Sequence, residues 1–196
     1  YSLNNLHKES DLFFDWYLKY CLRKKKISKI KRLLRKELTK IYKKLKFSNN
    51  TFVHRDFHVS NIMLKKKKLG LIDSQDAIIG NPLYDLASLI DDVRIKLPSN
   101  LQNNLIHFYH KNSKLKKIEI ENLKNDFDIL SVQRNLKILG IFVRLSKRDG
   151  KNNYLKFLPY TWVLLERRLK NPIFKNLKIL MNKNLPIKKL RKLNKI

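Results

Sequence analysis

The stretch H-R-D-F-H-V-S-N, residues 54–61, places six polar side chains between the apolar pairs Phe52-Val53 and Ile62-Met63. Short apolar runs that contain β-branched and aromatic residues favour strands, so the polar stretch is predicted to be a loop between two strands. Loops positioned by a rigid scaffold often carry functional residues. The residues alone leave two alternatives at this point: a polar turn, or a loop that performs chemistry.

A second polar cluster, Asp73 to Asp76, follows the next pair of predicted strands. Residues 62–64 and 69–72 flank a lysine-rich turn at residues 65–68, and this pattern is typical of a β-hairpin. A hairpin brings the chain back to the point where it started. We therefore expect both polar clusters to lie at the same end of the sheet.

Asp56, Asn61 and Asp73 carry the oxygen atoms that phosphoryl transfer to a hydroxyl requires. One carboxylate must orient the hydroxyl and accept its proton, and oxygen ligands must hold Mg²⁺ against the nucleotide phosphates. We predict that Asp56 is the catalytic residue and that Asn61 and Asp73 are metal ligands. The alternative for Asp56 and Asn61 is turn and cap chemistry, which we favour less.

Four neighbouring side chains have different predicted roles. His54 is interpreted as a structural histidine that braces the loop rather than as the base. His58 stays open between facing the acceptor and filling the loop, and Asp76 stays open between a neighbour of the metal site and a turn residue. Asp85 lies in the first turn of the next predicted helix, where a carboxylate suits the helix dipole, and we expect it to bond the backbone of the loop.

Most of the remaining sequence has helical periodicity, with no linker that would split it. Residues 131–148 are apolar around most of the helix circumference, which is typical of a buried helix. We predict one domain over residues 1–182 and a basic, partly disordered tail over residues 183–196. The other segments with apolar residues at helical spacing are residues 10–22, 30–45, 86–97, 100–111, 118–130 and 152–169.

The composition is strongly basic, with a formal net charge of +29. Such a charge fits nucleic acid or another anionic surface, but the lysines are spread along the chain and no nucleic-acid-binding signature is present, so we favour a compositional bias. The single cysteine, Cys21, excludes a disulfide within the chain and suits a cytoplasmic setting. No apolar run approaches the about 18 residues that a membrane helix needs, so no membrane association is expected.

The loop pattern H-x-D-x-x-x-x-N, the later Ile72-Asp73 and the helix start Y-D-L-A together resemble the protein kinase-like superfamily. Protein kinases usually have Lys at the position of His58 and D-F-G at the second site, where this chain has D-S-Q-D. These departures resemble the aminoglycoside phosphotransferase and choline kinase branch, which phosphorylates small molecules.

The resemblance then extends to the bacterial cell-wall amino-sugar kinases that phosphorylate N-acetylmuramate and N-acetylglucosamine at the anomeric hydroxyl. It covers most of residues 9–170, and one departure is Ser74, where that family usually has an aromatic residue. The segments that carry the resemblance are residues 11–18, 53–92, 133–145 and 148–150.

The resemblance implies the α+β fold of a kinase-like carboxy-terminal lobe, mainly α-helical with a small β-hairpin region at the catalytic loop. It also implies ATP and Mg²⁺ as cofactors and transfer of the γ-phosphate to an amino sugar, as in cell-wall recycling. The first glycine is Gly70, so no glycine-rich phosphate loop precedes the catalytic loop, and the nucleotide-binding residues are unknown. We expect an amino-terminal lobe to precede Tyr1.

Two alternatives remain beside the amino-sugar kinase: another small-molecule kinase of the same branch, or a non-catalytic remnant that binds nucleic acid. Arg134 and Arg144 lie on the largely apolar helix at 131–148, so each needs a partner. The partner could be a substrate carboxylate, a phosphate or an internal acid, and we favour the internal acid. The oligomeric state and the identity of the acceptor cannot be predicted from the sequence.

Overall fold

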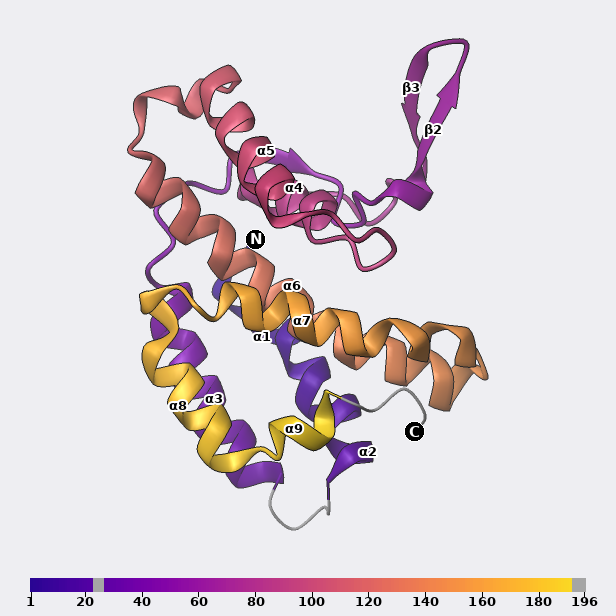
Figure 1. Ribbon diagram of the computed structural model, residues 1–196, viewed down its shortest axis with the longest axis vertical. Coiled ribbons are helices and arrows are strands. Elements are labelled where there is room, and N and C mark those ends of the chain that lie inside the picture. The colour runs from indigo at the N-terminus through magenta and orange to yellow at the C-terminus, as the bar shows by residue number, and fades with distance from the viewer. Residues whose placement is uncertain (23–26, 192–196) are drawn as a thin grey trace. The chain divides into compact units, whose positions relative to one another are not determined.

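The computed structural model describes residues 1–22 and 27–191 and is mainly helical, with small antiparallel sheets (Figure 1). This confirms the predicted α+β class. The chain forms two compact units. Unit 1 contains Tyr1 and Leu45–Ser131, and unit 2 contains Ser2–Lys44 and Val132–Ile196.

The strands of unit 1 form two separate pairs. The predicted hairpin is confirmed, because β2 (Ile62–Lys65) pairs antiparallel with β3 (Lys68–Leu71) and extends from the polar loop (Figure 1). Lys66 and Lys67 have φ angles of 47° and 63°, as a two-residue hairpin turn with positive φ at both positions requires.

The second pair was only half predicted. Strand β1 (Thr51–Val53) lies antiparallel to β4 (Ile78–Gly80), with Phe52 opposite Ile79. The sequence around β4 indicated a turn at Gly80-Asn81-Pro82 but gave no strand signal, because the strand is only three residues long. The polar loop thus leaves β1, and the second polar cluster is followed at once by the partner of β1.

The helices of unit 1 differ from the prediction in two places. The helix predicted over residues 86–97 ends early, at Ile90. The two helices predicted over 118–130 and 131–148 are one continuous helix, whose first part belongs to unit 1. The helices are η3 (Val59–Asn61), α4 (Leu83–Ile90), α5 (Ser99–Asn112), η4 (Lys114–Lys117) and α6 (Ile120–Asp149).

A buried carboxylate joins the ends of the β1–β4 pair. Asp126 on α6 is fully buried and accepts hydrogen bonds from the backbone of Lys46 and Phe47 at 2.9 to 3.0 Å and from Asn81 Nδ2 at 3.2 Å. Burial raises the pKa of the Asp126 carboxyl, and the hydrogen bonds from Phe47, Lys46 and Asn81 offset part of that rise. Asp126 thereby fixes the segment before β1 and the segment after β4.

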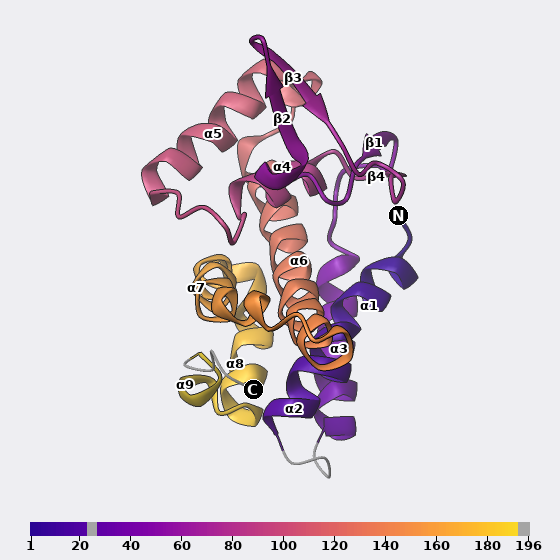
Figure 2. The same ribbon diagram turned by 90° about the vertical axis from the view of Figure 1, so that its right-hand side faces the viewer.

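Unit 2 is built from helices alone among its described residues, and the views in Figures 1 and 2 show their course. The second part of α6 is buried over residues 132–140, as its apolar circumference predicted. The other helices are α1 (Leu3–Leu12), η1 (Phe13–Leu18), α2 (Lys19–Cys21), α3 (Ile27–Tyr42), η5 (Asn152–Phe157), α7 (Leu158–Arg168), η6 (Pro172–Phe174), α8 (Lys175–Asn184) and α9 (Ile187–Leu190).

An aromatic core holds these helices together. Trp162 Nε1 donates a hydrogen bond of 2.7 Å to the hydroxyl of Tyr17, which in turn donates to the carbonyl of Leu190 at 2.8 Å. Both rings are buried, and burial raises the pKa of Tyr17. Gly140 on α6 packs so closely against Leu12 that a Cβ atom would lie 2.3 Å from the Leu12 backbone.

The predicted basic tail begins within α8. Leu185 and Leu190 are buried in unit 2, and residues 192–196 lie outside the described residues, so the partial disorder stays a prediction. Within residues 1–22 and 27–191, the structure contains no helix with both the length and the apolar character needed to cross a membrane.

Candidate active site

The backbone of the loop at residues 54–61 is held by Asp85. The carboxylate of Asp85, in the first turn of α4, accepts hydrogen bonds from the backbone N–H of His54 at 2.7 Å and of Arg55 at 3.0 Å. This confirms the role predicted for Asp85. Arg55 has a φ angle of 71°, a conformation that non-glycine residues adopt at some energetic cost. The Asp85 carboxylate stabilises that conformation.

His54 braces the same loop through its side chain. The ring is buried, with 1% of the residue exposed, and Nε2 lies 2.9 Å from the carbonyl oxygen of Ile72. A carbonyl oxygen can only accept, so Nε2 carries the hydrogen, and the other ring nitrogen, Nδ1, is buried without a hydrogen-bond partner among the described residues. This contact supports the structural interpretation of His54 over the general-base alternative.

The two polar loops are adjacent in unit 1. Besides the His54 contact, the N–H of Ile72 donates to the carbonyl of Asn61 at 3.1 Å, and Arg55 Nη1 donates to the carbonyl of Asp76 at 3.2 Å. Asp73, which follows Ile72, has a φ angle of 62°. The hairpin therefore brings the second cluster back to the first loop, as the sequence pattern predicted.

The predicted catalytic residue Asp56 and the predicted metal ligands Asn61 and Asp73 keep side-chain oxygen atoms that the described protein does not use. Asn61 Nδ2 donates to the carbonyl of Asp56 at 3.0 Å, which leaves Oδ1 as the acceptor atom of that amide. Within the described residues, the carboxylates of Asp56 and Asp73 accept no hydrogen bond and form no ion pair. Asp73 is exposed and Asp56 is half-buried.

These atoms fit Mg²⁺ chemically, because Mg²⁺ prefers oxygen ligands and takes only one or two carboxylates from the protein. In the part of the chain that the structure describes, no three His, Cys, Asp or Glu side chains are grouped so that they could hold a metal ion. The predicted metal ligands are one carboxylate, Asp73, and one amide, Asn61, so they are not a cluster of that kind.

Comparison with family models shows the family of the chain. The model of the phosphotransferase enzyme family matches residues 6–119, more than half of the chain, and the match includes both polar loops and Asp85. The chain belongs to the phosphotransferase enzyme family. The family that the loop motifs resembled is thereby confirmed.

Relatives of the chain include proteins named N-acetylmuramate/N-acetylglucosamine kinase. The protein from Neisseria meningitidis serogroup B is 31% identical over 163 residues, which cover 81% of this chain and 49% of the relative. The protein from Pseudomonas aeruginosa is 32% identical over 165 residues, 82% of this chain and 49% of the relative. The protein from Caulobacter vibrioides is 28% identical over 145 residues, 71% of this chain and 39% of the relative. The chain spans about half the length of the curated relatives it matches, or less.

One group bonded to the loop at residues 54–61 was not predicted. Asp92, with 1% exposed, accepts a hydrogen bond from the backbone N–H of Val59 at 3.1 Å on one oxygen. Its other oxygen accepts from the backbone N–H and from Nη1 of Arg94, both at 3.0 Å. Asp92 was missed because the predicted helix was too long. A helix that continued to residue 97 would place Asp92 inside the helix and not in the turn after it. The signal that could have found it is the D-x-R spacing, since Asp often bonds its own backbone two residues on.

Arg134 and Arg144 belong to unit 2, whereas the polar loops belong to unit 1. Arg134 is buried, and the predicted internal acid partner stays a prediction for both arginines. The buried ion pair in this part of α6 involves a different residue: Lys137 Nζ lies 3.3 Å from Glu9 Oε1, and Gln133 Nε2 donates to Glu9 at 2.8 Å. The sequence gave no indication of Glu9, which α1 contributes.

Proposed function

We propose that this chain carries the acceptor-activating and metal-binding loops of an ATP-dependent small-molecule kinase, with an amino sugar as the phosphate acceptor. The observation that carries the proposal is the Asp56 carboxylate, which is unused by the described protein while the backbone on its N-terminal side is fixed by Asp85. A carboxylate with no protein partner, on a strained and firmly held loop, is suited to a substrate.

The proposed chemistry follows from what a phosphoryl transfer needs. The acceptor hydroxyl attacks the γ-phosphorus of ATP, its proton passes to the Asp56 carboxylate, and the bond between the γ-phosphorus and the ADP oxygen breaks. Orientation and proton acceptance by such a group typically accelerate a reaction by about 10²–10⁴-fold. The proposal gives His54 a bracing role and no part in this proton transfer, because its ring is buried and its Nε2 donates to the carbonyl of Ile72.

Asn61 Oδ1 and the Asp73 carboxylate are the groups that would hold Mg²⁺, consistent with the oxygen atoms that they leave available. The metal ion would neutralise charge on the nucleotide phosphates. Asp76 is exposed, and its backbone carbonyl accepts a hydrogen bond from Arg55. This contact supports the interpretation of Asp76 as a turn residue. The direct role of Asp76 at the metal stays open.

The amino-sugar acceptor is supported by the names of the relatives at 28 to 32% identity and by the segments that resemble amino-sugar kinases. Use of ATP fits a cytoplasmic reaction. An aminoglycoside or choline-like acceptor is the alternative within the family, and a cationic acceptor of that kind would require several acidic side chains beyond Asp56 and Asp73. The chain has 16 Asp and Glu residues against 45 Lys and Arg, which favours the amino sugar.

The strands of unit 1 support a further part of the proposal, that an additional polypeptide lobe covers them. On the hairpin, Leu64 is 72% exposed and Leu69 is 76% exposed. An isolated hairpin of two strands is only marginally stable in water. Large exposed apolar residues of this kind mark interaction surfaces. The other large apolar side chains exposed on these strands are Phe52, Met63, Leu71 and Ile79.

The half of the relatives' length that this chain does not span is the proposed source of that lobe. The backbone of Tyr1 lies at the same strands, because its amino group donates to the carbonyl of Ile79 at 3.1 Å. Chain preceding Tyr1 would therefore start beside β4. The lobe would carry the nucleotide-binding groups that residues 1–69, which contain no glycine, do not offer.

The test of the proposed function is a kinase assay on the complete protein encoded by the reading frame that contains this chain. ATP and Mg²⁺ are supplied with N-acetylmuramate, N-acetylglucosamine, an aminoglycoside and choline in parallel, and ADP release is measured. Turnover of the amino sugars alone is the expected result. Turnover of only the cationic acceptors would overturn the amino-sugar assignment, and no turnover together with salt-sensitive nucleic-acid binding would overturn the kinase assignment.

A further inference from the structure

Arg94 is held beside the catalytic loop by a buried carboxylate. Helix α4 ends at Ile90, and the following turn places Asp92 between two segments. One oxygen of Asp92 accepts from the backbone of Val59, three residues after Asp56, and the other accepts from the backbone and the side chain of Arg94. The guanidinium of Arg94 is therefore tied, through one side chain, to the loop that carries the proposed base.

Asp92 is better explained as a support than as a ligand. It is 1% exposed and its two oxygens receive N–H groups from Val59 and Arg94, so little acceptor capacity remains for a substrate. Its neighbour Asp91 is also fully buried and accepts from the hydroxyl of Ser131. Asp92 is bonded both to the loop and to the arginine.

Arg94 has donor capacity left over. Its side chain is 24% exposed, and among the described residues Asp92 is its only hydrogen-bond or ion-pair partner, through Nη1. A guanidinium carries several N–H donors in a planar fork that matches a carboxylate, so Nε and Nη2 can still bind a ligand. Fixing one arm of the fork on Asp92 limits the rotamers of the side chain and reduces the entropy lost when a ligand binds.

We infer that Arg94 binds the carboxylate of an acidic amino sugar such as N-acetylmuramate, and that it sets the preference for this acceptor over neutral N-acetylglucosamine. This inference rests on the proposed function. The two sugars in the relatives' names differ by a lactyl ether that carries a carboxylate, so one of them needs a cation at the acceptor site and the other does not. In unit 1, Arg94 is bonded to Asp92, and this buried acid is also bonded to the loop that contains Asp56.

Steady-state kinetics of the complete protein test the inference, with Arg94→Gln compared against the parent on both sugars at saturating ATP. Loss of a bidentate charge-assisted contact is expected to lower kcat/KM for N-acetylmuramate by about 10- to 100-fold, chiefly through KM. N-acetylglucosamine should change by less than about threefold. The carboxamide of N-acetylmuramate, which lacks the charge, should be as insensitive to Arg94→Gln as N-acetylglucosamine is.

Further variants separate recognition from structure. Asp92→Asn/Arg94→Gln removes both charges and avoids an unpaired buried acid, and it should show the same selective loss if it folds like the parent in a thermal-unfolding measurement. Arg94→Lys keeps the charge without the planar fork and should fall between the parent and Arg94→Gln. Arg148→Gln, at an exposed arginine paired with Asp149 in unit 2, is the matched control and should leave the ratio of the two sugars unchanged.

The outcomes distinguish the two levels of the argument. A parent protein that phosphorylates neither sugar overturns the proposed function and the inference with it. A parent that phosphorylates both, with variants in which kcat/KM falls equally for both sugars or for neither, overturns the inference alone and leaves Arg94 as a structural partner of Asp92.

Discussion

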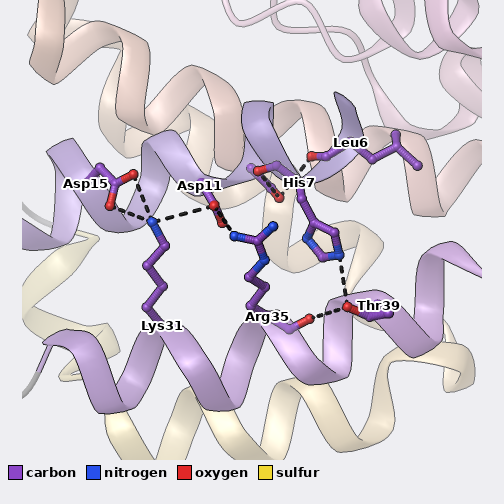
Figure 3. Close-up of polar contacts among 8 residues, drawn as sticks. Leu6, His7, Asp11, Asp15, Lys31, Arg35 and Thr39 are labelled. Atoms are coloured by element: carbon purple, nitrogen blue, oxygen red, sulfur yellow. Dashed lines mark hydrogen bonds and ion pairs between the residues drawn. The ribbon is translucent and has the colours of Figure 1, made fainter. Parts of the chain in front are cut away.

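The segments H-K-E-S-D at residues 7–11 and H-R-D-F-H at residues 54–58 have similar residue types and very different contacts. In unit 2 the first segment lies on α1, and its His and Asp are paired with side chains of α3 (Figure 3). In unit 1 the second segment is a loop held through its backbone. The comparison shows that a carboxylate with no protein partner among the described residues, that of Asp56, and not the residue types, separates the candidate active site from a structural cluster in which each carboxylate is paired.

Figure 3 shows the pairing in the α1–α3 cluster, which also includes Asp15 of η1; His7 Nδ1 and Asp11 Oδ1 are its buried atoms without a hydrogen-bond partner among the described residues. His7 Nε2 lies 2.9 Å from the Thr39 hydroxyl, and Arg35 Nη1 donates to Asp11 at 2.6 Å. Lys31 contacts Asp11 at 3.5 Å and Asp15 at 2.7 Å. The charges of this cluster therefore compensate one another. On the loop of unit 1, by contrast, Asp56 has no such partner among the described residues.

The largest expected effect that follows from this contrast is on catalysis. Asp56→Asn in the complete protein should lower kcat by about 10²–10⁴-fold, because the amide cannot accept the acceptor's proton. Its free energy of unfolding should stay within about 0.5 kcal/mol of the parent, since no protein hydrogen bond is lost. ADP release and urea unfolding measure the two quantities.

Asp11→Asn is the matched control for that variant, with the opposite expectation. Activity should be retained, while stability falls by about 1 kcal/mol because Arg35 and Lys31 lose a partly buried partner. Equal kcat values for Asp56→Asn and the parent would remove Asp56 from its proposed role.

The next effect concerns the backbone of the loop. Asp85→Ala removes the acceptor of two backbone N–H groups, those of His54 and Arg55, and should destabilise unit 1 by about 2–4 kcal/mol. Thermal unfolding and kcat should fall together, since the same contact positions Asp56. Asp76→Ala is the comparison, because the described contact of Asp76 uses its backbone carbonyl. If Asp76→Ala lost as much stability as Asp85→Ala, the interpretation that Asp85 holds the loop through its backbone hydrogen bonds would be wrong.

A third effect tests the close packing of unit 2. Gly140→Ala would place a Cβ atom 2.3 Å from the backbone of Leu12, so α1 or α6 must shift, and we expect a loss of about 1–3 kcal/mol. Gly70→Ala on β3 is the matched control, because no heavy atom lies within 4 Å of the new Cβ, and it should change stability by less than about 0.5 kcal/mol. Chemical denaturation of both variants measures the difference, which would vanish if α1 did not pack on Gly140.

The two polar loops of unit 1 were predictable from the sequence because their signals are local. Two short apolar runs that flank a lysine-rich turn predicted the β2–β3 hairpin, and the hairpin implied that Asp73 returns to the loop of Asp56. The predicted clamp by Asp85 followed from its place in the first turn of a helix. Each of these inferences needed no information about distant parts of the chain.

The features that could not be predicted depend on contacts between residues far apart in the sequence, or on a small difference in stability between two local conformations. The three-residue strand β4 exists only because β1 pairs with it, and the buried pairing of Glu9 with Lys137 joins residues 128 positions apart. The early end of α4 reflects competition between helix propensity and the hydrogen bonds of Asp92 to Arg94 and Val59. Periodicity favoured the longer helix, because Val93 and Leu97 fit the helical template.

The smallest expected effect is a pH dependence that distinguishes the two histidines of the opening comparison. Burial lowers the pKa of His7, the charge of Arg35 lowers it further, and Asp11 partly opposes this shift. Thr39 already donates to the carbonyl of Arg35, so His7 Nε2 donates to Thr39, and a second ring proton would sit on buried Nδ1, which has no hydrogen-bond partner within the described residues.

Because the folded state binds this proton less readily than the unfolded state, the contribution of His7 to stability is complete above pH 6.5 and is lost as the pH falls through the lowered pKa. Urea unfolding of the parent at about pH 7.5 and about pH 5, compared with His7→Gln, measures this contribution, because the amide can still donate to Thr39 but does not titrate. The variant should lose less stability on acidification than the parent. An identical loss in both proteins would mean that His7 can be protonated without disturbing its contacts, and the α1–α3 cluster would then resemble a solvated surface more than the compensated network drawn in Figure 3.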